Sequence, residues 1–390
     1  MSQLEEYRAK IDAIDAQLSR LFLERMEVTG RVGKYKKAQG IPVLDAQREK
    51  QVIAAKTSLT DNPAAKADLA ALYESIMAIS RRQQRKLVRE GSEDRGYARW
   101  LKALEDRRSP VDDPRVVYQG EPGCYSEEAA AGFFGERVES KGLPWFDDVF
   151  AALSRGEADY AMLPIENSST GSIRQVYDLL AQYDFSLVGE WQVKVEHCLA
   201  ALPGVKLEDI KTVYSHEQGL MQCDKFLDGH RDWARVPVLD TAGSAKQVSE
   251  TGDRAVAAIC SRRAAKLDGQ EELAFPINHN AANVTRFVAV SPRLELREGR
   301  DKISAVFSLP HQSGSLHEIL TIFAVQGLNL QKLESRPILG RGWEYLFFLD
   351  FTGDLTAPGM DGVLHELSQL SADFRILGNF RAYEGENGHG

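Results

Sequence analysis

The stretch IDAIDAQLSRLFLERMEVTGRVGKYK, residues 11–36, carries apolar side chains at the spacing of one face of a long helix. The repeat continues on both sides and forms a seam of large apolar residues: Leu4, Tyr7, Ile11, Ile14, Leu18, Leu21, Val28, Val32 and Tyr35. Arg25 occupies a slot of this seam where the repeat predicts an apolar residue. An unpaired guanidinium there is costly, so we expect an anionic partner, which is either a side chain or a ligand.

The length of this helix predicts a partner chain. A helix over residues 3–38 would run about 54 Å at 1.5 Å per residue. Such a rod cannot be buried within the helical segment of residues 1–90, where helices are also predicted over 45–57 and 63–90. We therefore expect the seam to pair between copies of the chain, as a homodimer or a higher homo-oligomer.

Charged and polar residues of the three predicted helices converge on one place. Arg25 and Lys36 lie eleven residues apart, so they occupy the same side of the first helix, about 16 Å from each other. Arg8 lies roughly 25 Å before Arg25, and only an antiparallel partner would bring it to the same ligand. The other helices each add side chains that share one face: Asp45, Arg48 and Glu49, and then Ser80 and Gln84. A solvated charged surface is the alternative for these residues taken singly.

Composition excludes several classes of protein. The net charge of −9 disfavours a nucleic-acid partner. No apolar run reaches the length of about 18 residues that a membrane helix needs, and the charged N-terminus argues against a secretory signal. The four cysteines are scattered without a CxxC pair, which fits a reducing cytoplasm and argues against a zinc site. The eight histidines form no HExxH motif, so the sequence shows no metal signature. No cofactor is expected either.

The pattern changes twice along the rest of the chain. Residues 91–113 are highly charged and predict a linker with room for a short helix. Over 114–293 short apolar strands alternate with helical stretches, which predicts α/β structure with mostly parallel sheets, either one doubly wound domain or two lobes with a cleft. Residues 302–383 follow the βαββαβ order of a ferredoxin-like α+β module, and the tail 384–390 is expected to be disordered.

Hydroxyl-rich strings stand out in the α/β segment: GCYSEEAA (123–130), PIENSSTGS (164–172), SHEQGLMQC (215–223) and NVTRF (283–287). Turns of this kind, after a strand and before a helix, are where α/β folds bind anions. Glu166 follows the apolar stretch ADYAMLPI and is expected at that strand's carboxyl end. Helix caps and turns are the alternative interpretation, and we favour it for Ser126 and Ser172.

The helical segment resembles the all-helical class of chorismate mutases. The similarity covers the whole segment and is carried by ERMEVTGRVGKYK, LDAQREK and ISRRQQ. It implies an intertwined dimer whose cations bind the carboxylates and ether oxygen of chorismate: Arg8 from the partner subunit, Arg25, Arg48 and Lys36. Gln84 would join Lys36 at the ether oxygen, and Asp45, Glu49 and Ser80 would complete the pocket. Such a rearrangement needs no nucleophile, but it needs a dianion held in its reactive conformer and donors at an oxygen that gains charge.

Residues 114–293 closely resemble prephenate dehydratase, and the strings IEN…GS, SH.Q…QC and NVTRF carry the similarity. It implies two α/β lobes with the site in the cleft between them, and Thr285 as the main catalytic hydroxyl with Arg286 and Phe287 beside it. The other implied site residues are Glu166, Asn167, Ser168 and Thr170 from one lobe and Ser215, His216, Gln218 and Gln222 from the other. We expect Thr285 to polarise the leaving hydroxyl, and Glu166 to supply the proton if burial raises its pKa.

Two departures from the dehydratase pattern are visible. Asp240-Thr241-Ala242 stands where the family usually has Ser-Thr-Ala, and Lys266-Leu267-Asp268-Gly269 lacks the usual aromatic before glycine. Both departures could alter the pocket or the substrate preference. His279 and Cys223 are interpreted as structural residues.

The C-terminal module resembles the amino-acid-binding ACT domain of phenylalanine-pathway dehydratases, through GLNL (327–330) and ESRP (334–337). Gly327 is expected to end a helix, and Pro337 to mark the end or edge of a strand. The resemblance implies that phenylalanine binds at ACT–ACT interfaces and inhibits the enzyme. The implied contacts are Gly327, Leu328, Asn329, Leu330, Glu334, Ser335, Arg336 and Pro337. A module that serves only in dimerisation is the alternative.

These resemblances together predict a bifunctional enzyme that converts chorismate to prephenate and prephenate to phenylpyruvate, with feedback by phenylalanine. Two alternatives stay open. The dehydratase could prefer arogenate, in which an amine replaces the keto group, and the relative rates on the two substrates would separate these cases. A non-catalytic amino-acid sensor would instead bind phenylalanine and turn over neither substrate.

Overall fold

A computed structural model describes residues 2–89, 95–309, 311, 314–338 and 340–385. The chain divides into two compact units, Met1–Arg95 and Gly96–Gly390, and each is considered by itself. Most of the tail predicted to be disordered lies outside the described residues, as does the beginning of the predicted linker.

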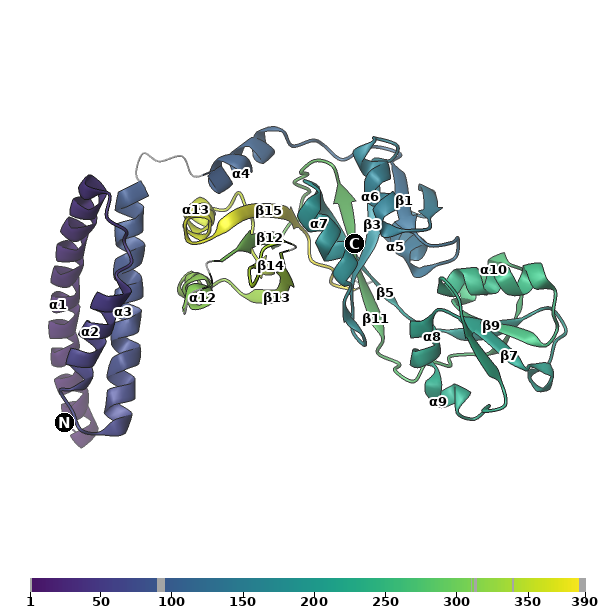
Figure 1. The fold of residues 1–390 in the computed structure, drawn as a ribbon, viewed down its shortest axis with the longest axis horizontal. Coiled ribbons are helices and arrows are strands. Elements are labelled where there is room, and N and C mark those ends of the chain that lie inside the picture. The colour runs from purple at the N-terminus through teal and green to yellow at the C-terminus, as the bar shows by residue number, and fades with distance from the viewer. Residues whose placement is uncertain (1, 90–94, 310, 312–313, 339, 386–390) are drawn as a thin grey trace. The chain divides into compact units, whose positions relative to one another are not determined.

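The first unit consists of the three predicted helices, α1 (Gln3–Gln39), α2 (Ala46–Thr57) and α3 (Pro63–Arg89) (Figure 1). α1 begins with a capping box between Ser2 and Glu5. It ends at Gly40, whose φ of 65° is the left-handed conformation that glycine adopts without strain. Both α1 and α2 pack against α3. A Cβ placed on Gly33 would lie 3.1 Å from Gln84 Cγ, so α1 and α3 approach closely there.

The apolar seam of α1 remains exposed in the single chain. Its nine large residues keep between 40% (Val32) and 62% (Tyr35) of their surface accessible, whereas the buried residues of α1 are Met26 and Gly33. A continuous row of exposed apolar side chains is typical of a surface that pairs with another chain.

Residues 95–105 form a helix, α4 (Arg95–Glu105), that packs on the C-terminal module. Trp100 is buried in the core of that module. A Cβ on Gly96 would lie 2.8 Å from Ser368 Oγ, so the helix approaches closely because it carries glycine there. This is a short helix of the kind for which the linker prediction left room, and the apolar face of RGYARWLKALE is buried like that of any amphipathic helix.

The first α/β lobe is built on a sheet in the order β2-β1-β3-β11-β5, with β4 paired to β3. Its elements, in chain order, are β1 (Arg115–Gln119), α5 (Tyr125–Phe134), β2 (Glu139–Leu143), α6 (Phe146–Ser154), β3 (Tyr160–Asn167), β4 (Gly171–Ser172), α7 (Arg174–Gln182), β5 (Ser186–Lys194) and, much later, β11 (Val284–Ser291).

The second lobe has its own sheet, in the order β10-β6-β9-β7-β8. Its elements are β6 (Cys198–Ala201), a 3₁₀ turn (Leu207–Asp209), β7 (Thr212–Ser215), α8 (Glu217–Gln222), α9 (Asp224–Leu227), β8 (Ala234–Pro237), α10 (Thr241–Thr251), β9 (Val256–Cys260), α11 (Arg262–Leu267) and β10 (Glu271–Ala274). The segment therefore folds as two lobes and not as one doubly wound domain (Figure 1).

Both sheets are mixed, which corrects the prediction of mostly parallel sheets. In the first lobe β1 and β3 are parallel, but β11 runs antiparallel to β3 and β5. In the second lobe β6 runs antiparallel to β9 and β10. The chain passes from β5 into β6 and returns from β10 into β11. β6 and β11 therefore each enter their sheet directly from the other lobe, and not through a crossover helix that packs on the same sheet.

The C-terminal module has the predicted βαββαβ order, with an antiparallel sheet in the order β13-β14-β12-β15. Its elements are β12 (Lys302–Ser308), α12 (Ser315–Val325), β13 (Leu330–Pro337), β14 (Tyr345–Thr352), α13 (Met360–Leu370) and β15 (Ala372–Phe380). Phe307 and Leu349 pack with the helices, while Val306, Phe348 and Leu377 join the core of the first lobe. The ferredoxin-like fold is confirmed. Gly327 follows α12 with a φ of 66°, and Pro337 ends the edge strand β13, as expected.

Within the described residues no helix is both long enough and apolar enough to cross a bilayer. The same residues contain no group of three or more His, Cys, Asp or Glu side chains placed to hold a metal ion. All four cysteines are free thiols.

Candidate active sites

The helical unit places several predicted residues between α1 and α3. Arg25 Nη1 donates to Ser80 Oγ at 2.5 Å. The structure gives Arg25 no ion pair with any residue that it describes, so its partner within the chain is a neutral hydroxyl and not a carboxylate. A guanidinium has five N–H donors, and those not used by Ser80 are available to an anion.

Gln84 is the residue of this unit that most clearly indicates a missing partner. Its side chain lies one helical turn from Ser80, and the residue is only 7% exposed, yet its Oε1 has no hydrogen-bond partner. Buried amide groups are nearly always hydrogen-bonded, because an unpaired one loses its water without compensation. Lys36, one turn beyond Gly33 on α1, donates from Nζ to Val43 O at 2.6 Å.

The predicted residues of α2 are placed differently. Asp45 caps the helix by accepting from Arg48 N at 2.9 Å, and Arg48 itself is exposed. Glu49 pairs with Arg81 of α3. Arg8 is exposed on α1, as it would have to be to reach a partner chain.

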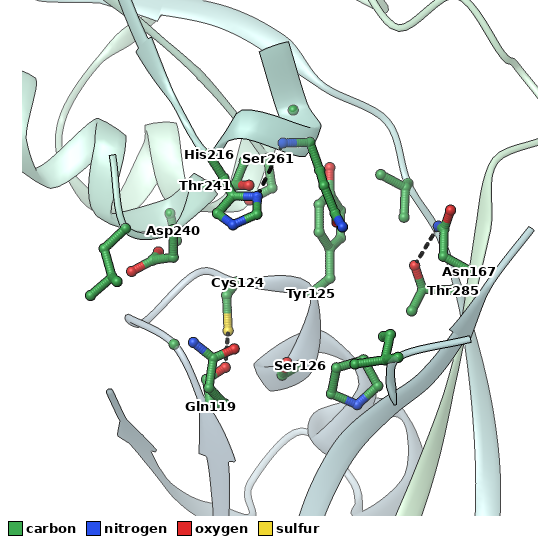
Figure 2. A pocket seen from close by; sticks show the side chains of 18 of the residues that line it. Gln119, Cys124, Tyr125, Ser126, Asn167, His216, Asp240, Thr241, Ser261 and Thr285 are labelled. Carbon is green, nitrogen blue, oxygen red and sulfur yellow. Dashed lines mark hydrogen bonds between the residues drawn. The ribbon is translucent and has the colours of Figure 1, made fainter. Parts of the chain in front are cut away.

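The second unit holds a cavity of about 410 Å³ between the two α/β lobes (Figure 2). Loops at the carboxyl ends of strands and the first turns of helices line it, which is the usual ligand position in open α/β sheets. Several of the predicted residues contribute to the lining: Asn167, Thr170, His216, Gln218, Gln222, Thr285 and Phe287.

Thr285 is oriented by its neighbour across the sheet. Asn167 donates from Nδ2 to Thr285 Oγ1 at 2.9 Å. The Oδ1 of Asn167 accepts from the backbone N–H groups of Ser169 and Thr170 at 2.9 and 3.0 Å, which determines which way the amide faces. Because Thr285 accepts from Asn167, its own hydroxyl proton is free to be donated into the cavity.

Glu166 and Arg286, two of the predicted site residues, are not among the residues that line the cavity. Glu166 directly precedes Asn167, and Arg286 directly follows Thr285. Successive side chains of a strand point to opposite faces of a sheet. Arg286 Nη2 pairs with Glu166 at 3.3 Å, and its Nη1 pairs with Glu190 and Asp350 at 3.1 and 2.9 Å. Burial acts to lower the pKa of Arg286, but the carboxylates of Asp350 and Glu190 outweigh it and raise that pKa.

This ion-pair cluster joins β3 and β11 to the C-terminal module. Asp350 belongs to β14, and Lys332 of β13 pairs with Glu166 at 2.8 Å. Further along β13, Ser172 donates to Glu334 at 2.7 Å and Arg336 pairs with Asp178 at 2.8 Å. The sheet of the module is thus bonded to the rear of the strands that carry Asn167 and Thr285.

Two of the predicted serines form hydrogen bonds with backbone groups that stabilise the fold. Ser215 is fully buried and donates to Ile259 O at 2.8 Å, so its hydroxyl ties β7 to β9. Ser168 donates to Ala282 O at 3.2 Å and accepts from Val284 N at 2.9 Å. Neither contributes to the cavity lining. The structural interpretation of Cys223 and His279 agrees with the structure, since Cys223 is buried in the second lobe's core and His279 Nδ1 lies 3.0 Å from Asp224.

The cavity also has residues that the sequence interpretation missed. His197 is 2% exposed; its Nε2 lies 2.8 Å from Gln222 Oε1 and its Nδ1 lies 3.2 Å from the Tyr125 hydroxyl. Burial lowers the pKa of His197, which keeps the ring neutral near pH 7. It stands where β5 passes into β6, so it links Tyr125 of one lobe to Gln222 of the other. The sequence signal that could have identified His197 was its position at the start of the apolar run HCLAAL.

Ser126 was interpreted as a cap or turn residue, and Asp240 was noted as part of a departure that could alter the pocket. Ser126 does not cap a helix: Cys124 is the N-cap of α5, and Ser126 lies in its first turn, 6% exposed and facing the cavity. Ser172 lies in β4 and bonds to Glu334. Asp240 caps α10 and lines the cavity from the second lobe.

Two family models match the chain. The model for chorismate mutase type II matches residues 7–85, within the helical unit, and the model for prephenate dehydratase matches residues 116–295, over the two α/β lobes.

Solved structures similar to this chain cover the second unit. A prephenate dehydratase in complex with L-Phe, from Arthrobacter aurescens, is 34% identical with a TM-score of 0.62, covering 69% of this chain and 90% of that one. GqqA, described as a novel type of quorum quenching acylase, is 31% identical with a TM-score of 0.64, covering 69% and 98%.

Curated relatives extend the similarity to the whole chain. Arogenate dehydratase/prephenate dehydratase 2, chloroplastic, of Arabidopsis thaliana is 38% identical over 277 residues, which are 68% of this chain and 72% of that protein. The bifunctional chorismate mutase/prephenate dehydratase of Escherichia coli strain K12 is 32% identical over 389 residues, which are 97% of this chain and 96% of that protein. With both family matches, this full-length similarity shows that the chain belongs to the family of bifunctional chorismate mutase/prephenate dehydratases.

Proposed function

We propose that the chain catalyses two consecutive steps of phenylalanine biosynthesis, the rearrangement of chorismate in the first unit and the conversion of prephenate to phenylpyruvate in the second. The observation that carries the proposal is the Asn167–Thr285 pair, which leaves the hydroxyl proton of Thr285 free to be donated into a cavity of about 410 Å³. Family membership supports both activities.

The cations and the amide that lie between α1 and α3 support the mutase step. Arg25 supplies guanidinium donors for a substrate carboxylate and holds the dianion in its reactive conformer. Lys36 and Gln84 donate to the ether oxygen, which gains negative charge as the C–O bond breaks. The unpartnered amide of Gln84 suits this role, because a carboxamide can turn by 180° and present its N–H groups within the same space.

Replacing Gln84 with alanine is expected to lower mutase turnover by roughly 10²–10³-fold, as for the loss of one transition-state donor. The dehydration of added prephenate should be unchanged, since that cavity belongs to the other unit. Gln51→Ala, at an exposed position of α2, is the matched control. Steady-state rates on chorismate test the effect, and wild-type mutase turnover in Gln84→Ala would remove Gln84 from the ether oxygen.

A second copy of the chain completes the mutase site in this proposal. The exposed seam of α1 pairs between copies, and it brings Arg8 of the partner subunit to the ligand beside Arg25. The support is the exposure of all nine seam residues and of Arg8 in the single chain.

The dehydratase step removes the ring carboxylate as CO₂ and the ring hydroxyl as water, and aromatisation drives it. Thr285 donates to the departing hydroxyl and is held for this purpose by Asn167. A threonine hydroxyl is a weak acid in water, so its role is to polarise the leaving group. His197 is a positioning residue, because it fixes Gln222 at the opposite wall through the hydrogen bond of 2.8 Å.

Phenylalanine is proposed as an inhibitor that binds the C-terminal module at the strings 327–330 and 334–337. A relative of the dehydratase part is described in complex with L-Phe. Within β13 the alternation of side chains separates two sets: Glu334 and Arg336 bond to the first lobe, while Ser335 and Pro337 are exposed. Ser335 and Pro337 can therefore contact an effector, and Glu334 and Arg336 can pass a displacement of the strand to the dehydratase.

Ser335→Ala is expected to weaken inhibition by phenylalanine without lowering the uninhibited rate, because the exposed hydroxyl contacts no part of the cavity. The half-inhibitory concentration should rise several-fold, as for the loss of one hydrogen bond worth about 1 kcal/mol. Ser371→Ala, in the same module but outside both strings, is the control. An inhibition curve that superimposes on that of the wild type would refute the contact.

The whole proposal is tested by following chorismate to phenylpyruvate by absorbance, with and without phenylalanine. Appearance of prephenate and then of phenylpyruvate supports both steps. A chain that binds phenylalanine but consumes neither chorismate nor prephenate would be an amino-acid sensor, and the proposal would fail.

A further inference from the structure

The wall of the dehydratase cavity has an unusual charge for a site that takes a dianion. Among the lining residues, all within the described part of the chain, there is no lysine or arginine, and the one carboxylate is that of Asp240. A substrate with two carboxylates therefore meets neutral donors and one negative group. Like charges at close range oppose binding, so this wall favours a ligand that brings a positive charge of its own.

Asp240 does not need its charge to build the fold. Its Oδ1 accepts from Gly243 N at 2.6 Å and caps α10. Serine or asparagine caps a helix about as well, so capping alone does not select a carboxylate. The structure gives Asp240 no ion pair within the residues it describes, and the ionisable groups that act on it are Glu121 and His216. Glu121 is itself paired with Lys246 at 3.0 Å.

Half burial of this carboxylate raises the pKa of Asp240 above its ordinary value. The charged form is thus short of compensation from the protein itself. A cation bound beside it would supply that compensation.

The position of Asp240 identifies which part of a substrate it meets. Figure 2 shows Asp240 and Thr285 on opposite sides of the cavity. In prephenate the leaving hydroxyl and the three-carbon tail sit at opposite ends of the ring. With the hydroxyl at Thr285 in the first lobe, the tail extends toward the second-lobe wall that carries Asp240. The group within reach of Asp240 is then the keto oxygen of the tail, or an amine in its place.

We infer that Asp240 is a specificity-determining residue that binds an α-ammonium group, and that the cavity thereby has a second activity, on arogenate. This rests on the proposed dehydratase function of the same site. The step is the same for both substrates: the C–CO₂ and C–OH bonds break, one proton joins the departing hydroxyl, and the released electron pair completes the aromatic ring. Arogenate yields phenylalanine, CO₂ and water, and no oxidant is required.

Two variants test the inference while they preserve the helix cap. Asp240→Asn and Asp240→Ser keep a side-chain oxygen for Gly243 N but remove the charge. The wild type should convert both arogenate and prephenate. In each variant kcat/KM for arogenate should fall roughly 10- to 100-fold, the cost of one hydrogen bond to a charged group, mainly through KM. The value for prephenate should stay equal or rise, because a repulsive charge is gone.

Glu217→Gln is the matched control, since this exposed carboxylate stands between His216 and Gln218 but is not part of the lining. It should leave the ratio of the two kcat/KM values unchanged. If the wild type converts prephenate and either does not act on arogenate or keeps its substrate ratio in Asp240→Asn, the inference fails while the dehydratase function stands. If neither substrate is consumed, the proposed function fails first.

Discussion

Replacing Thr285 with alanine is expected to lower phenylpyruvate formation by roughly 10²–10³-fold or more, and prephenate made from chorismate should accumulate. The methyl group of alanine cannot donate to the departing hydroxyl. The substitution also leaves the Nδ2 of Asn167 without the acceptor that lies 2.9 Å away in the native chain. Phenylpyruvate absorbance on added prephenate measures the loss.

The bifunctional chain supplies its own control for this experiment. Mutase turnover depends on residues of the first unit, so it should be unchanged in Thr285→Ala and reports that the protein is folded. Thr285→Ser keeps the hydroxyl and should retain most of the dehydratase rate. Near-normal dehydration by Thr285→Ala would exclude Thr285 from the chemistry, whatever the state of the cavity.

Replacing Arg286 with methionine is expected to destabilise the second unit by about 3–5 kcal/mol, because it leaves buried carboxylates without their cation. The Arg286 side chain is 11% exposed, and the side chains of Glu190 and Asp350 are 1% and 13% exposed. Lys302 would still pair with Glu190 at 2.7 Å, but Asp350 would lose its guanidinium partner. Urea unfolding followed by tryptophan fluorescence measures the change.

Arg155→Met is the matched control, because Arg155 also pairs with a carboxylate, that of Glu157, at 2.6 Å. Both of those side chains are more than half exposed, so water already screens the pair, and no resolvable change in stability is expected. Equal midpoints for Arg286→Met and the wild type would mean that the ion-pair cluster between β3, β11 and the C-terminal module contributes nothing net to the fold.

Local pattern was enough to predict most elements of this protein. The helical repeat predicted α1 to α3, and the alternation of apolar runs with amphipathic stretches predicted strands such as β1, β3 and β9, because burial of one face imposes its period on the sequence. The order of elements then indicated the ferredoxin-like module. The strings that resemble known families located Asn167, Thr285, Gln222 and Gln84, since the residue types that a reaction needs recur at set spacings.

The relative direction of the strands and the packing of α4 depend on contacts between segments that are distant in the sequence. A strand's sequence does not state its direction, and β11 is antiparallel to β3 because the chain returns from the other lobe. Trp100 needs an apolar partner, but only the folded chain shows that the C-terminal module provides it.

The sequence by itself determined the helical segment, the α/β segment, the apolar seam of α1 and the short motifs that carry the candidate site residues. These features depend on the order and period of neighbouring residues. Tertiary structure alone decided which of two adjacent residues lines the cavity. Thr285 faces the cavity and Arg286 faces the C-terminal module, since a strand turns alternate side chains to opposite faces and only packing settles which face encloses the cavity. For the same reason the place of His197 in the cavity wall became apparent only from the way the two lobes enclose one space, and Asp240, noted in the sequence as a departure, was located in that wall.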